Sequence, residues 1–297
     1  MIKNALLVFL GACSFGVLST FVKLAYSEGY NLGEVTGAQV FFGMITLWIL
    51  FFAGKATGLV RKKPEKGRDA LWKLFAAGLP TGLVTLTLYK CVELVPASIA
   101  IILLMQFVWI GILIEFLIFK RKPTQAQLFS VVLVLGGTLL AAGLLNQQPH
   151  DLSIEGVIYG LLAATFYSIF LIVMSRVGNT YPAVQKSALM LTGSCILIFI
   201  VFPPAFFFNG VLTGGLWKWG LLLSLFGTVI PPLFFAIGIP KTGVTLSSII
   251  SAAELPVAVA MSYLILGEKV SGLQWLGVFI ILSAIIISNV FGKRKAL

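Results

Sequence analysis

The chain has 297 residues, of which 59% are hydrophobic and only 10% are charged, and its mean hydropathy is +1.05. Water-soluble globular domains are far less apolar, so this composition excludes them and indicates an integral membrane protein. The net charge of +11 could suggest a nucleic-acid-binding protein, but the basic residues cluster in short segments between apolar runs, which is a signal of membrane topology.

Apolar runs of about 20 residues predict ten membrane-spanning helices, each long enough to cross a hydrocarbon core of about 30 Å. In chain order the predicted spans cover residues 4–26, 34–53, 72–91, 97–119, 124–145, 156–177, 185–207, 217–238, 243–265 and 272–291. The first run is too long for the core of a signal peptide, so we expect it to be retained. Pro80 and Gly82 in the third span, and Pro231 and Pro232 in the eighth, predict kinks or breaks beside a cavity or a packed neighbour.

The distribution of lysine and arginine predicts the orientation of the spans. If both termini are cytoplasmic, every basic residue except Lys23, Lys90, Lys218 and Lys269 falls on the cytoplasmic side. Because basic loops stay inside, we predict a multi-pass protein of the cell membrane, embedded in the lipid bilayer, with both termini in the cytoplasm.

A weak internal repeat divides the chain into residues 1–146 and 147–297. Sliding the sequence by 147 residues lays the fourth span on the ninth and the fifth on the tenth, and aligns Lys122 and Gln127 with Lys269 and Gln274. Five spans in each half is an odd number, so the halves must have opposite orientations in the membrane. The predicted fold is an all-α polytopic membrane protein, with ten transmembrane helices forming two inverted five-helix repeats around a central cavity.

The ninth predicted span contains an acidic residue near its middle. In a continuous helix over residues 243–265, Glu254 would lie about 16 Å from either end, near the midplane of the bilayer. A charge there costs about 2.5 to 3.5 kcal/mol, so Glu254 should face protein or water rather than lipid. By helical phase it shares one side with Ser247, Ser251, Ala258 and Ser262, a small and polar stripe that favours a cavity or a close neighbour.

The repeat assigns a matching stripe to the fourth span. Glu254 corresponds to Phe107, and the stripe continues through Gly111 to Glu115, the other acidic residue inside a span. Glu115 lies about 7 Å inside the cytoplasmic end, because Lys120 follows five residues later. The substrate-binding residues predicted from the two stripes are Ser247, Ser251, Glu254, Phe107, Gly111 and Glu115.

Three segments of the sequence carry a family signature. Residues 253–288 read AELPVAVAMSYLILGEKVSGLQWLGVFIILSAIIIS, with a Glu-x-Pro and a Leu-Gly-Glu motif before a glycine-containing span. Residues 15–25 read FGVLSTFVKLA, and residues 163–176 read AATFYSIFLIVMSR. Together with the span count, these segments resemble the ten-span EamA-like members of the drug/metabolite transporter superfamily. In the first half the Glu-x-Pro position reads Phe107, Val108 and Trp109, so coupling through acidic residues could not be symmetric.

The resemblance implies alternating-access transport of small organic molecules, with the first, third, fourth, sixth, eighth and ninth spans around the central cavity. Known members handle amino acids and their metabolites, sugars, nucleobase derivatives, choline-like cations and drugs, so the family alone does not name a substrate. The implied central spans add four aromatic candidates to Phe107 in the substrate site: Phe15, Tyr89, Phe166 and Tyr167.

Each charged candidate also has a simpler interpretation. Glu254 could couple transport to protons or bind a cation, or it could be a neutral acid hydrogen-bonded to Ser251 or to backbone freed by the nearby proline. Glu115 could instead form an interfacial ion pair with Lys120 or Arg121.

Three further charged residues are candidates for gating or for pairing with a charged substrate. Lys90 and Glu93 lie three positions apart near the outer end of the third span, which predicts either an outer gate or a surface ion pair. Lys23 could pair with a substrate carboxylate, or its side chain could extend to the membrane interface.

Enzyme chemistry has little support in the sequence. The single histidine and both aspartates lie outside the spans, which disfavours intramembrane proteases and Ser-His chemistry. There is no P-loop motif for ATP, and the three cysteines have no paired spacing, so we expect no disulfide, metal site or cofactor. A membrane glycosyl transferase using Glu28 or Glu34 stays open as an alternative.

We therefore predict a secondary transporter that exports small organic solutes, either amino-acid-like metabolites or drugs. The alternatives are proton- or ion-coupled uptake of a small metabolite or quaternary amine, and a polytopic membrane enzyme. The expected partners are a small-molecule substrate, the lipid bilayer and a proton as coupling ion, with no nucleic acid, and the protein is expected to be a monomer or a homodimer.

Overall fold

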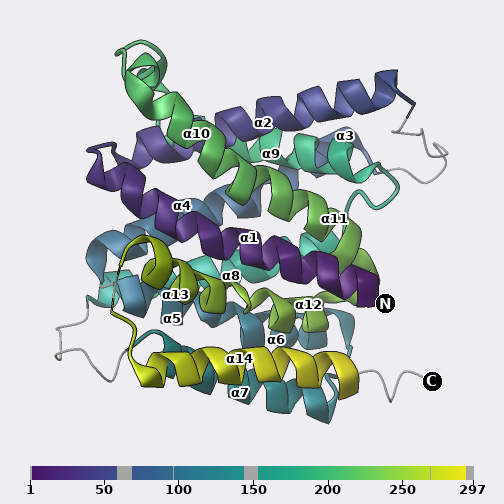
Figure 1. Ribbon diagram of the computed structural model, residues 1–297. Helices are drawn as coiled ribbons and strands as arrows, with labels where there is room; N and C mark the ends of the chain where they lie inside the picture. The colour runs from purple at the N-terminus through teal and green to yellow at the C-terminus, as the bar shows by residue number, and fades with distance from the viewer. Residues whose placement is uncertain (1, 59–68, 96, 144–152, 268, 292–297) are drawn as a thin grey trace.

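The computed structural model describes residues 2–58, 69–95, 97–143, 153–267 and 269–291, and every regular element among them is helical (Figure 1). The first half contains α1 (Ile2–Ser27), α2 (Leu32–Ala56), α3 (Leu71–Ala76), α4 (Leu79–Leu94), α5 (Ala97–Met105), α6 (Phe107–Phe119) and α7 (Gln125–Ala141). The second half contains α8 (Ile154–Arg176), α9 (Ala183–Val201), η2 (Ala205–Phe207), η3 (Leu212–Leu216), α10 (Trp217–Leu223), η4 (Ser224–Val229), α11 (Ile230–Thr242), α12 (Val244–Ser251), α13 (Glu254–Ile265) and α14 (Gly272–Phe291).

These helices account for the ten predicted spans. Nine stretches of the described chain are long and apolar enough to cross a membrane, and α7 is a shorter apolar helix of 17 residues at the position of the fifth span. The prediction of an all-α polytopic membrane protein is therefore confirmed.

The helices lie roughly side by side, so the molecule has two ends (Figure 1). The beginning of α1 and the ends of α2 and α14 lie at the same end, at the right of the picture. Following the predicted orientation, we call this the inner end and the opposite one the outer end.

Two long helices pack across the boundary between the halves. α1 of the first half packs against α11, α12 and α13 of the second, whereas α8 of the second half packs against α4, α5 and α6 of the first. α2 packs along α9, and α7 packs along α14. One large group of buried apolar residues joins α1, α6, α8, α11, α12 and α13, so these helices share a single core.

The helix starts reproduce the 147-residue offset predicted from the sequence. Three pairs of helices begin at equivalent positions in the two halves: α5 and α12 at Ala97 and Val244, α6 and α13 at Phe107 and Glu254, and α7 and α14 at Gln125 and Gly272. The chain is therefore built from two repeats with the same pattern of helices in this region.

The same local signal starts the last helix of each repeat. Before α7, Thr124 and Gln127 form a capping box in which each side chain accepts a hydrogen bond from the other residue's backbone N–H. Ser271 and Gln274 make the same pair of hydrogen bonds before α14. The alignment of Gln127 with Gln274 thus corresponds to a shared helix cap.

α7 and α14 run antiparallel. The Gln274 side chain, at the start of α14, donates a hydrogen bond of 3.4 Å to the Ala141 carbonyl at the end of α7. A β-carbon on Gly137 would lie 2.9 Å from the Gly277 carbonyl, so the two backbones touch where both residues are glycine. This pair of equivalent helices therefore points in opposite directions, as the prediction of inverted repeats requires.

The third span is interrupted at its proline, as predicted. It divides into α3 and α4, and α3 ends at Ala76, four residues before Pro80. The proline ring excludes a continuous helix there, because it clashes with the carbonyl four residues earlier and offers no N–H.

The eighth span contains a π-helical turn, η4, just before Pro231 and Pro232. The Ile230 N–H binds the Leu225 carbonyl, so the helical hydrogen bonds shift by one residue. The Ser14 hydroxyl on α1 donates to the Phe226 carbonyl at 2.7 Å. The predicted irregularity is therefore present, and α1 supplies a donor to it.

The ninth span corrects the prediction of a continuous helix over residues 243–265. α12 ends at Ser251, and α13 begins at Glu254. Pro256 has no N–H to offer the Ala252 carbonyl, and the N–H groups of Ala252 and Ala253 bind carbonyls only three residues back. Glu254 therefore lies at the start of a helix and not within one.

Candidate functional site

Glu254 is the first residue of α13, directly after the break in the ninth span. Its Oε2 atom is buried and has no hydrogen-bond partner, although the residue as a whole is only half-buried. A helix N-terminus favours a negative charge, whereas a buried carboxylate oxygen without a partner is costly. This atom is therefore available to a proton or to a donor group of a ligand.

Four hydroxyl groups near the break are also without hydrogen-bond partners. They belong to Ser247, Ser248 and Ser251 on α12 and to Tyr167 on α8, all of which are buried. The Tyr167 hydroxyl lies beside Ser251 and within electrostatic range of Glu254. Buried polar groups are normally hydrogen-bonded, so this group of side chains can bind polar atoms that the protein itself does not supply.

Five rings form an aromatic cluster next to these polar groups. The ring centroids of Phe107 and Tyr167 are 4.4 Å apart, and Phe15 lies 6.4 Å from Tyr167. Phe170 lies 5.9 Å from Tyr167, and Phe235 lies 5.8 Å from Phe15. The cluster thus draws its rings from α1, α6, α8 and α11, and it joins the two repeats.

Small residues bring the helices of the site into close contact. A β-carbon on Gly16 would overlap the Glu254 carbonyl, so α1 touches the start of α13 directly. A β-carbon on Gly111 would lie 3.0 Å from Ser248 Oγ, which shows how closely α6 approaches α12. The Ser168 hydroxyl on α8 donates to the Phe107 carbonyl at 3.0 Å and fixes the start of α6.

Most of the predicted substrate-binding residues lie on the helices that meet at the break. These residues are Glu254, Ser251, Ser247, Phe107, Gly111, Phe15 and Tyr167.

Sequence reasoning missed four residues of this region. Ser248 falls outside the predicted stripe. Nothing in the sequence marks Gly16 as a contact residue, apart from its position next to the candidate Phe15. Phe170 follows Tyr167 by about one turn on the same helix, and Phe235 lies in the eighth span, which the resemblance already placed near the centre. Both aromatic residues could have been included on those grounds.

Glu115 lies near the inner ends of α6 and α12, where its carboxylate already has partners. Its Oε2 atom accepts hydrogen bonds from the Thr245 N–H at 3.0 Å and from the Thr245 hydroxyl at 2.6 Å. Its Oε1 atom lies 3.6 Å from the Arg121 guanidinium. This geometry fits an interaction within the protein better than contact with a substrate.

The other aromatic candidates lie outside the aromatic cluster. Tyr89 packs against Tyr26 and belongs to a separate group of apolar residues around Val22, towards the outer end of α1. Phe166 is half-buried on α8, and it immediately precedes Tyr167, so its side chain points in a different direction.

The gating candidates lie at the surface. Lys90 and Glu93 form an ion pair of 3.0 Å in which both side chains are about half exposed, and Lys23 is exposed as well. An exposed ion pair contributes little to stability, which fits the simpler interpretation of Lys90 and Glu93.

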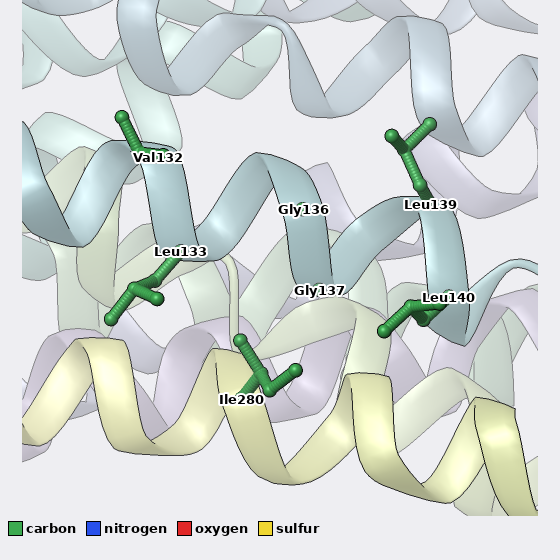
Figure 2. Close-up of a pocket in the computed structure, with 7 residues that line it drawn as sticks. All are labelled: Val132, Leu133, Gly136, Gly137, Leu139, Leu140 and Ile280. Atoms are coloured by element: carbon green, nitrogen blue, oxygen red, sulfur yellow. The ribbon is translucent and has the colours of Figure 1, made fainter.

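Two apolar hollows lie away from the break. The larger of the two, of about 440 Å³, runs along α7 and is lined by Val132, Leu133, Gly136, Gly137, Leu139, Leu140 and Ile280 (Figure 2). Leu133, Leu140 and Ile280 lie between α7 and α14, whereas Val132 and Leu139 point to the other side of α7. The second hollow lies between α6 and α7, beside Trp109. Their apolar, partly exposed linings suit lipid chains, so we do not place the substrate there.

Comparisons with known proteins agree with this fold. A model of the EamA-like transporter family matches residues 2–143 and 154–290, one match in each repeat. A solved crystal structure matches over 97% of this chain and 99% of its own, with a TM-score of 0.78 and 14% sequence identity, which shows a shared fold. No curated protein matches the sequence. Because the family matches cover nearly the whole chain, it belongs to the EamA-like transporter family.

Proposed function

We propose that this protein is a secondary transporter that moves small organic solutes through a site at the break in the ninth span. The observation that carries the proposal is the unpartnered Oε2 atom of Glu254, near the buried hydroxyls of Ser251 and Tyr167. Family membership supports transport of small solutes. In inverted-repeat transporters, broken helices near the midplane supply the binding groups, which matches this location.

The chemistry of the site favours a solute that has an apolar body and a hydrogen-bond donor. The aromatic cluster offers ring faces and edges, and Glu254 offers an oxygen atom that accepts hydrogen bonds. A protonated amine suits both groups, because carboxylates and aromatic faces attract cations. Amino-acid-like metabolites and amine drugs combine these features.

We propose export as the direction of transport and a proton as the coupling ion. If Glu254 binds either a proton or the amine of the solute, then each would displace the other, and proton entry could drive solute exit. Phe107 occupies the equivalent position of the first repeat, so this exchange would depend on a single acidic residue. Everted vesicles should therefore accumulate the solute when their interior is made acidic.

We also propose that the inner end faces the cytoplasm of the cell and that the protein lies in the cell membrane. The basic residues support this orientation, because Lys3 lies in the first turn of α1 and Lys55 lies in the last turn of α2, both at this end. Single cysteines introduced near Ile2 and near Ser27 should then react with an impermeant maleimide from opposite sides of the membrane.

The function is tested in two steps. A thermal-shift screen of amines, amino acids, nucleobases and sugars should identify a ligand, because binding to the folded state raises the melting temperature. Counterflow in proteoliposomes then measures transport of that ligand. The Glu254→Gln variant should transport it at least about tenfold more slowly, because the amide keeps the shape but not the charge.

The matched control is Glu155→Gln, which makes the same change at an exposed position in the first turn of α8 and should transport normally. If Glu254→Gln transported every ligand at the wild-type rate, then the site would lie elsewhere. If the wild-type protein transported none of the ligands that it binds, then the transport function itself would be contradicted.

A further inference from the structure

Hydrogen bonds from Thr245 to the Glu115 carboxylate join the two repeats near the inner end, and we call this contact the charged tie. Glu115 belongs to α6 of the first repeat, and Thr245 is the second residue of α12 of the second repeat. The Glu115 Oε2 atom accepts hydrogen bonds from the Thr245 N–H at 3.0 Å and from the Thr245 hydroxyl at 2.6 Å. Glu115 is only 3% exposed, so these hydrogen bonds form in a site that is shielded from water.

The tie takes the place of a local helix cap. α12 follows Gly243, which has a φ of 86° and no side chain with which to accept hydrogen bonds from the first turn. Glu115 supplies that acceptor from the other repeat, and its negative charge suits the N-terminal end of α12. The start of α12 is therefore held by α6.

The outer end cannot form the same tie. The 147-residue offset aligns Glu115 with Ser262 and Thr245 with Ser98, so the equivalent positions carry two serines and no carboxylate. Hydrogen bonds to a charged group are roughly twice as strong as those between neutral groups. The equivalent pair of positions at the outer end could therefore form only a neutral hydrogen bond, whereas the pair at the inner end includes a carboxylate.

We infer that Glu115 is a positioning residue that holds the inner ends of α6 and α12 together, and that this tie must break before the site opens at the inner end. α12 carries Ser247 and Ser251, and α6 carries Phe107, so separating the two helices would expose both faces of the site. The inference rests on the proposed transport function, but its test measures accessibility and does not depend on knowing a substrate.

The test uses single cysteines in a folded background whose native residues Cys13, Cys91 and Cys195 are replaced by alanine. Ser247→Cys reports on the inner side of the site, and Ala258→Cys on α13, one turn beyond Glu254, reports on the outer side. An impermeant maleimide is applied from each side, to right-side-out and to everted vesicles. The Glu115→Gln change should speed inner-side labelling of Ser247→Cys by about tenfold and should slow outer-side labelling of Ala258→Cys.

Two further variants separate the tie from other roles of Glu115. Thr245→Val removes the hydroxyl but keeps the N–H, so it should have the same effect at reduced size, and it serves as the test if Glu115→Gln fails to fold. Arg121→Gln removes a guanidinium whose side chain is 66% exposed, so it should leave labelling nearly unchanged.

Three results would overturn the inference. Labelling of both cysteines could be unchanged by Glu115→Gln, or it could rise equally from both sides, which would indicate general loosening of the fold. Alternatively, Arg121→Gln could act as strongly as Glu115→Gln, which would assign the effect to the interfacial ion pair. Failure of this test would leave the transport measurements at Glu254 unaffected, so the two proposals can be judged separately.

Discussion

Phe107 and Glu254 occupy the same position in the two repeats, since each is the first residue after the break in its span. The two breaks differ in whether their polar side chains have hydrogen-bond partners. In the fourth span, the Gln106 side chain donates to the Ile102 carbonyl at 2.9 Å and accepts a hydrogen bond from Trp109 at 2.8 Å. In the ninth span, the Glu254 Oε2 atom has no partner. The polar groups named at the first break therefore have hydrogen-bond partners, whereas the second break leaves a carboxylate oxygen without one, which is why we propose the second break as the site.

The contact between α1 and α13 predicts that Gly16→Ala is destabilising. The new β-carbon would overlap the Glu254 carbonyl and would lie 2.7 Å from the Val257 side chain, so the helices would have to move apart. Overpacking of this kind costs about 1 to 3 kcal/mol of unfolding free energy. Thermal unfolding of the purified protein in detergent measures the loss.

Gly136→Ala is the matched control, because a β-carbon there would meet nothing within 4 Å. Alanine is the better helix former by about 1 kcal/mol, so this variant should be as stable as the wild type or slightly more stable. Equal destabilisation by both substitutions would show that the contact at Gly16 is not responsible.

Pro256→Ala tests whether the break in the ninth span serves transport. Alanine would offer the Ala252 carbonyl an N–H four residues on, in place of its present hydrogen bond from the Leu255 N–H at 3.3 Å, which favours a single helix running from α12 into α13 and stabilises it by up to about 3 kcal/mol. We expect a higher melting temperature together with slower counterflow. Pro182→Ala, at the N-cap of α9, is the control and should leave the counterflow rate unchanged. A Pro256→Ala protein with full transport activity would show that the break is only structural.

The spans could be predicted from the sequence because they depend on local hydropathy. Hydropathy located the ten spans, and the matching order of spans at an offset of 147 residues indicated the repeat. The structure reproduces this repeat, and both Gln127 and Gln274 form capping boxes in it. The prolines likewise predicted the interruptions of the third and eighth spans, since a missing N–H acts wherever it occurs.

Other features depend on contacts that the sequence does not display. The break at Gln106 occurs without a proline. There the Gln106 side chain, and not the Gln106 N–H, donates to the Ile102 carbonyl, and no sequence pattern marks such a substitution. The aromatic cluster depends on how α8 and α11 pack. Phe170 and Phe235 lie on spans that the family resemblance places at the centre, but the sequence does not show that their rings meet each other or that Phe170 meets Tyr167. The partner of Glu115 depends on the approach of α12 to α6, across 130 residues of sequence.

The π-helical turn in the eighth span predicts a measurable role for Ser14. Its hydroxyl donates to the Phe226 carbonyl at 2.7 Å, and Ser14→Ala would remove that donor. We expect a loss of about 1 kcal/mol in unfolding free energy. Thr165→Ala is the control, because its exposed hydroxyl bonds only to the Leu161 carbonyl of the same helix, and it should change stability by less than about 0.5 kcal/mol.

Lys186 illustrates how a charge that signals topology can also be structural. The sequence places it among the basic residues of the cytoplasmic side, but the structure buries it, with 1% exposed, in the first turn of α9. Its Nζ atom donates to the Met174 carbonyl at 2.6 Å and to the Asn179 side chain at 2.9 Å. The lysine therefore donates a hydrogen bond to a carbonyl in the last turn of α8, and its aliphatic chain fills space in the core.

Two substitutions of Lys186 separate these contributions. Lys186→Met keeps the volume but leaves the Met174 carbonyl short of a donor, so we expect a loss of about 1 to 3 kcal/mol. Lys186→Ala also removes the buried aliphatic chain and should cost about 2 to 5 kcal/mol. Thermal unfolding of the two purified variants shows which of them loses more stability. Equal losses would mean that the hydrogen bonds alone carry the stabilisation, and the absence of any loss would mean that the buried lysine is kept for a reason other than stability.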